Sequence, residues 1–88
     1  MARIYDPCNK VFVSCLRDFR LKANMTQSDL ASVIGCSQAY ISKYERGQKR
    51  LDIVEIRRIC LAFNISLVEL MAEYESRLRK EVSGYGTQ

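Results

Sequence analysis

The side chains best placed to do chemistry lie between two glycines, Gly35 and Gly47. A helical repeat through this segment turns Ile41 inward and leaves a polar, short-chained face outward. That face consists of Gln38, Ala39, Ser42 and Lys43. A glutamine amide donates and accepts at once, so it can pair with the edge of adenine, and a lysine can bind guanine or a phosphate. The face is short enough to enter the major groove of DNA, although a merely solvated helix face is the alternative reading.

Three cations follow this face, and they are suited to binding phosphates beside it. They are Arg46, Lys49 and Arg50. Residues 1–50 hold nine Lys or Arg against four Asp or Glu, a balance of +5, whereas residues 51–88 hold five against six, a balance of −1. A basic half favours a polyanionic partner, while a solvated charged loop is the alternative.

Other chemistries lack the residues that they require. The chain of 88 residues has no histidine, the commonest general base, and no recognisable pair of catalytic carboxylates, so we expect no enzymatic activity. It has no closely spaced CxxC pair that would indicate a zinc site. We expect reduced, small hydrophobic side chains at the four cysteines, Cys8, Cys15, Cys36 and Cys60. No metal, cofactor or small-molecule ligand is expected.

The N-terminal segment carries Asp6 and Pro7 without an apolar stretch after them, so it does not have the pattern of a signal peptide. No apolar segment is long enough to predict a membrane span. We therefore expect a cytoplasmic protein with a single compact domain.

Capping residues and glycines divide the chain into five expected helices, with no convincing strand. Thr26 and Asp29 have the spacing of a capping box, Gly35 can end the helix that follows, and Asn24 tolerates the left-handed conformation. The expected helices cover residues 10–23, the segment between Thr26 and Gly35, residues 38–45, Asp52 to Phe63, and Ser66 to about residue 80. We predict an all-α, five-helix bundle over residues 10–80, with an N-terminal arm at 1–9 and a flexible tail at 81–88.

The second and third expected helices meet the steric demands of a helix-turn-helix. Both are short, and a turn containing glycine separates them. Ala31 is small where the two helices would cross, and Gly35 can take the positive φ that a tight turn needs. Ile41 and Tyr44 would pin the third helix to the core.

The chain resembles the Cro/C1-type (Xre-like) helix-turn-helix family in three segments: TQSDLA at 26–31, GCSQ at 35–38 and ISKYERG at 41–47. The resemblance covers residues 12–70, and the family includes phage repressors and restriction–modification controller proteins. It implies a lambda-repressor-like fold of five helices, here with an extended C-terminal helix.

The resemblance also implies roles for individual residues. Base reading is implied for Ser37, Gln38, Ala39, Ser42 and Lys43. Phosphate binding is implied for Gln27, Tyr40, Arg46, Lys49 and Arg50, with the helix N-terminus assisting Gln27. A partly buried salt bridge is implied between Arg20 and Glu45, tying the first helix to the end of the third.

The last expected helix carries more apolar surface than one thin core can cover. We predict a dimer interface at its far end, formed by Met71, Tyr74 and Leu78. Two copies would place their recognition helices about 34 Å apart, one turn of DNA. The sequence thus predicts a homodimeric, sequence-specific transcriptional regulator, such as a repressor, on a two-fold-symmetric operator. The alternative is a protein-interaction module with the same fold, as in antitoxins or regulator antagonists.

Overall fold

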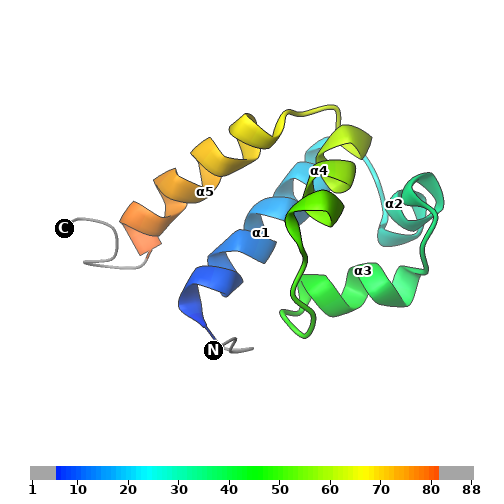
Figure 1. The fold of residues 1–88 in the computed structure, drawn as a ribbon, viewed down its shortest axis with the longest axis horizontal. Coiled ribbons are helices and arrows are strands. Elements are labelled where there is room, and N and C mark those ends of the chain that lie inside the picture. The colour runs from blue at the N-terminus through cyan, green and yellow to red at the C-terminus, as the bar shows by residue number, and fades with distance from the viewer. Residues whose placement is uncertain (1–5, 82–88) are drawn as a thin grey trace.

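The computed structural model describes residues 6–81, which form five helices and no strand (Figure 1). The helices are α1 (Pro7–Lys22), α2 (Gln27–Ile34), α3 (Gln38–Glu45), α4 (Ile53–Ala62) and α5 (Leu67–Glu81). The all-α, five-helix prediction is therefore confirmed. Among residues 6–81, no helix combines the length and the apolar character that crossing a membrane requires.

The first helix begins three residues before the expected start at residue 10. Asp6 caps it, because the Asp6 carboxylate accepts a hydrogen bond of 2.9 Å from the backbone N–H of Cys8. Pro7 fits the first turn, where its missing N–H costs no hydrogen bond. The predicted arm at 1–9 was thus too long; its residues 1–5 lie outside the described part of the chain. Residues 82–88 of the predicted tail also lie outside it, while Glu81 belongs to α5.

Local hydrogen bonds fix where the other helices start and stop. Thr26 and Asp29 form the expected capping box at α2, and their hydrogen bonds lower the pKa of the Asp29 carboxyl. The same reciprocal arrangement opens α4 and α5. Asn24 adopts the left-handed conformation predicted for it, with φ of 61°, and so does Asn64, with φ of 59°.

The core lies where α1, α2, α3, α4 and α5 converge. Its fully buried side chains are Cys15, Leu16, Leu30, Ile41, Tyr44, Ile59, Cys60 and Leu70. Ala31, at the expected crossing of α2 and α3, is 4% exposed. Burial of one face of α3 leaves its other face outward, on the side of the bundle away from α5 (Figure 1).

The far end of α5 packs against α1 within the same chain. The Tyr74 ring meets the Phe12 ring edge-on, with centroids 5.1 Å apart, and its hydroxyl donates to the Cys8 carbonyl at 3.1 Å. Leu78 is 8% exposed, and Met71 packs against the core. Leu78 is thus buried within one chain, whereas Met71 and Tyr74 remain half-buried, and the dimer interface expected at these residues stays a prediction.

Polar contacts next to these apolar contacts also fix the position of α5 against α1. The Arg77 guanidinium reaches Asp18 at 2.8 Å, Glu73 at 2.8 Å and the Ser14 hydroxyl at 3.1 Å. Two of these partners belong to α1, so the ion pairs and the apolar contacts act on the same pair of helices.

We predict that Leu78→Ala lowers the free energy of unfolding by about 2–4 kcal/mol, because it removes a buried side chain and leaves a cavity. Urea denaturation measures the change. The loss should not depend on protein concentration, since the contact lies within one chain. Val68→Ala, at a side chain that is 77% exposed, is the control and should change stability by less than about 0.5 kcal/mol. A loss that disappears at high protein concentration would instead assign Leu78 to an interface between copies.

Candidate nucleic-acid interface

A tight turn at Gly35 sets the angle between α2 and α3. Gly35 has φ of 76°, and the backbone N–H groups of Gly35 and Cys36 both donate to the Ala31 carbonyl at 2.9 Å. A Cβ atom at Gly35 would meet nothing within 4 Å, so the left-handed backbone is what favours glycine there. Ser37 then caps α3, its hydroxyl accepting from the Tyr40 N–H at 3.1 Å. The turn thus fixes the direction of α3 before any partner binds.

The outward face of α3 carries the residues predicted to read bases. Four of them are exposed: Ser37, Gln38, Ala39 and Lys43. Ser42 is half-buried, and its hydroxyl accepts a hydrogen bond from Arg46 Nη1. Ile41 and Tyr44, on the opposite face, are fully buried. The five positions therefore share one accessible strip along α3.

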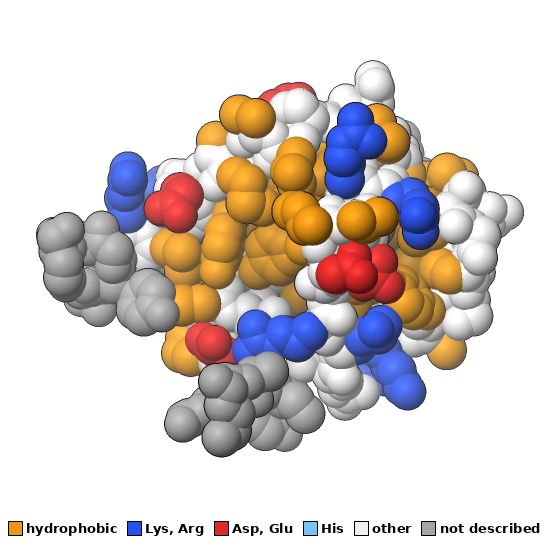
Figure 2. All heavy atoms as spheres, viewed as in Figure 1, with side chains coloured by type: hydrophobic (Ala, Val, Ile, Leu, Met, Phe, Trp, Pro, Cys, Tyr) orange, Lys and Arg blue, Asp and Glu red, His pale blue; other side chains and the backbone are white. Residues whose placement is uncertain are grey.

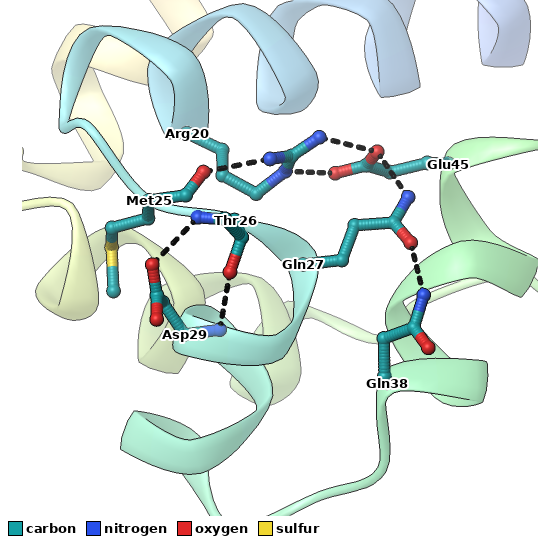
Figure 3. Close-up of polar contacts among 7 residues, drawn as sticks. All are labelled: Arg20, Met25, Thr26, Gln27, Asp29, Gln38 and Glu45. Carbon is teal, nitrogen blue, oxygen red and sulfur yellow. Dashed lines mark hydrogen bonds and ion pairs between the residues drawn. The ribbon is translucent and has the colours of Figure 1, made fainter.

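A buried ion pair anchors the end of this helix to α1, as the family resemblance implied (Figure 3). Arg20 Nε donates to Glu45 Oε2 at 2.7 Å and Arg20 Nη2 donates to Glu45 Oε1 at 3.1 Å. The third contact of the guanidinium is the Met25 carbonyl, at 2.7 Å. The side chains of Arg20 and Glu45 are 7% and 4% exposed. The bond to Glu45 raises the pKa of Arg20, so the guanidinium stays charged.

Two glutamines continue this network onto the outward face of α3 (Figure 3). Gln27 Nε2 donates to Glu45 Oε1 at 3.0 Å, and Gln38 Nε2 donates to Gln27 Oε1 at 2.8 Å. The Gln38 amide is thereby oriented, while its carbonyl and second N–H make no hydrogen bond to the described residues. The sequence placed both glutamines in the site but did not reveal that they are bonded to each other.

The predicted phosphate ligands Arg46, Lys49 and Arg50 follow α3 in the loop before α4. Arg46 is held by Ser42 and by Gln48 Oε1, the latter 3.1 Å from Nη2. The Lys49 ammonium lies 5.4 Å from the centroid of the Tyr40 ring, and Arg50 lies 3.5 Å from the Asp6 carboxylate. Gln48, which the sequence did not single out, therefore belongs to this cationic loop as the residue that orients Arg46.

Tyr40, which was expected to bind a phosphate, has its hydroxyl bonded within the protein. Its hydroxyl donates to Glu55 Oε2 at 2.7 Å and so joins α3 to α4. Burial and the neighbouring carboxylate raise the pKa of Tyr40, so the hydroxyl remains protonated and bonded. A phosphate at this position would also meet the negative charge of Glu55. Tyr40 therefore joins α3 to α4, and phosphate binding by this residue stays a prediction.

The short α2, the tight turn, the outward polar strip of α3 and the adjacent cations together define a helix-turn-helix domain. The chain belongs to the helix-turn-helix family, whose profile matches residues 16–70. It is 31% identical over 58 residues to the antitoxin PezA of Streptococcus pneumoniae. That match spans 66% of this chain and 37% of PezA.

Solved structures share the fold over most of their length. The clp gene regulator ClgR from C. glutamicum superposes with a TM-score of 0.73 and 25% identity, covering 81% of this chain and 91% of ClgR. The restriction–modification controller protein C.Esp1396I, as a tetramer in complex with its natural 35-base-pair operator, gives a TM-score of 0.77 and 25% identity. That match covers 83% of this chain and 96% of the controller chain. The family predicted from the sequence is confirmed.

We predict that Glu45→Ala lowers the free energy of unfolding by about 3–5 kcal/mol, because it leaves the Arg20 guanidinium buried without its carboxylate. Urea denaturation of Glu45→Ala, Arg20→Met and the double variant forms a double-mutant cycle. The double variant should lose less than the sum of the two single losses, because no uncompensated charge remains. Strictly additive losses would contradict the coupling of these two side chains.

Proposed function

We propose that the protein is a sequence-specific DNA-binding transcriptional regulator that acts in the cytoplasm. The observation that carries the proposal is the Gln38 amide, held outward by the chain of hydrogen bonds through Gln27 to the Arg20–Glu45 pair. An amide with one carbonyl and one N–H directed outward matches the N6 and N7 atoms of adenine. Family membership and the operator complex of C.Esp1396I support a duplex as the partner.

In the proposed complex, α3 enters the major groove and the cationic loop binds the backbone. Gln38 and Lys43 read bases, while Ser37, Ala39 and Ser42 permit close approach. Gln27, Arg46, Lys49 and Arg50 contact phosphates in this proposal, while the Tyr40 hydroxyl keeps its bond to Glu55. The phosphate contacts supply affinity for any sequence, and the strip on α3 supplies the choice among sequences.

The proposed regulator binds as a homodimer, through a surface different from the one expected at the end of α5. Three large apolar side chains of α4 are more than half exposed: Ile53, Val54 and Leu61. They line a shallow groove of about 250 Å³ together with Arg57 and Arg58. Figure 2 shows hydrophobic side chains gathered on the face of the molecule formed by α4 and α5.

A second copy is the occupant that fits this α4 surface. Val54 and Leu61 are seven residues apart, so they lie on one side of the helix and can meet the same pair from an antiparallel copy. A two-fold-symmetric dimer would also supply the second recognition helix that a long operator site needs, since α3 alone covers only a few base pairs.

A second candidate is a protein-interaction module in which the α4 surface binds a different protein. The similarity to an antitoxin favours this candidate. The cationic loop favours DNA, because an interaction module has no need of cations beside an outward polar helix. Salt-dependent binding to duplex DNA distinguishes the two.

Gln38→Ala tests the assignment of base reading. We predict that it costs about 1–3 kcal/mol on the preferred duplex and much less on random duplexes, because a bidentate contact to one base is lost. Fluorescence anisotropy on duplexes with single base-pair changes measures the difference. Ser76→Ala, at an exposed position of α5, is the control and should leave both affinities unchanged. Equal weakening on preferred and random duplexes would remove Gln38 from the base-reading set.

The double variant Val54→Asp/Leu61→Asp tests the proposed dimer surface. We predict a folded protein whose self-association weakens by at least about tenfold, because charges replace the apolar contact. Sedimentation equilibrium measures the association, and circular dichroism checks the fold. Val33→Asp, at an exposed valine of α2, is the control. Unchanged association of the double variant would place the interface elsewhere.

A further inference from the structure

A basic groove lies beside the helix-turn-helix, between α1 and the end of α3. It has a volume of about 580 Å³. Its polar lining includes three cations, Lys10, Arg17 and Arg46, together with Ser14 and Gln48. Lys10 and Arg17 belong to α1. They lie outside the parts that the proposed function uses, which are the turn at Gly35, α3 and the cationic loop after it.

On the α1 side, three polar residues line the groove in a row. Lys10, Ser14 and Arg17 are spaced at i, i+4 and i+7, so they share one face of the helix, and all three are exposed. The row extends along about 10 Å of α1 at about 1.5 Å per residue. Within residues 6–81, neither Lys10 nor Arg17 takes part in an ion pair, whereas Arg77, next to them on α5, is bonded to two carboxylates.

The one carboxylate that lines the groove does not neutralise these cations. It belongs to Glu45, whose side chain is 4% exposed and has both oxygens bonded to Arg20. Gln27 donates a further hydrogen bond to one of them. The groove therefore presents three positive charges to solvent, and its acidic residue is already balanced within the protein.

The groove is continuous with the outward strip of α3. Arg46 lines it and also donates to Ser42, one of the residues of that strip. Figure 1 shows the C-terminal end of α3 lying toward α1, so the groove begins where the proposed base contacts end. An anionic strand that leaves the major groove at this end of α3 would pass over Lys10 and Arg17.

We propose that this groove binds the DNA backbone that flanks the base pairs read by α3, with Lys10 and Arg17 as phosphate ligands. This inference rests on the proposed function. The cations are spread along the groove and exposed, so each would bind a small anion weakly. A polyanion engages all of them and releases a counterion at each contact, which makes a row of separated cations effective.

The test compares two variants that remove the same charge. Lys10→Gln/Arg17→Gln should reduce the slope of log affinity against log salt by about two units, since each lost phosphate contact contributes about 0.9. Arg79→Gln/Lys80→Gln, at exposed cations near the end of α5, should leave the slope unchanged to within about half a unit. The preference among base sequences should be the same in both variants, unlike that of Gln38→Ala.

Shortening the duplex provides the second measurement. Removing base pairs outside the preferred site should weaken the wild type, because flanking phosphates are lost, but should leave the Lys10/Arg17 variant unaffected. Equal salt slopes for the Lys10/Arg17 variant and the wild type would overturn the inference. A second result would also overturn it. In that result, the wild type binds pyrophosphate or an acidic peptide and the Lys10/Arg17 variant does not, while the variant keeps the wild-type salt slope for DNA. If the wild type itself shows no salt-dependent duplex binding, the proposed function fails instead.

Discussion

Two opposite charges, almost removed from water, determine how the helices of this protein are arranged. The Arg20 guanidinium makes two bonds to Glu45 and a third to the Met25 carbonyl, so α1, the turn before α2 and the end of α3 meet at one group. The free energy lost by desolvating such a pair is about as large as the free energy gained from its attraction. We therefore infer that the pair mainly fixes the relative positions of the helices. An apolar contact would tolerate sliding, whereas a planar guanidinium facing a carboxylate does not.

The orientation of the reading face follows from this pair. Helices of eight residues are too short to be stable alone, so α2 and α3 depend on the groups that hold their ends. Buried Ile41 and Tyr44 hold the inner side of α3, the Gly35 turn holds its start, and Glu45 holds its end. Gln27 then carries the constraint to Gln38. The amide is set before a partner arrives, so binding does not have to order it.

The sequence predicted the features that depend on neighbouring residues. Asn24, Gly35 and the Thr26–Asp29 box each act within a few residues, so their types identify them. The sequence does not predict the start of α1, because Asp6 caps the helix from within the expected N-terminal arm. Contacts between helices also could not be predicted from the sequence. The periodicity of α5 shows that Tyr74 and Leu78 are apolar, but not that Tyr74 bonds to α1 or that Leu78 is buried within the same chain. The bond from Tyr40 to Glu55 likewise joins two helices whose separation no local pattern specifies.

Selection of the wild-type protein on a pool of random duplexes tests the central claim most directly. If α3 reads bases and the protein binds as a dimer, the recovered duplexes should share one two-fold-symmetric sequence with half-sites about 34 Å apart. Binding to that sequence should weaken steeply as salt increases. Recovery of no common sequence, with no salt-dependent binding to any duplex, would contradict the account and favour a protein partner.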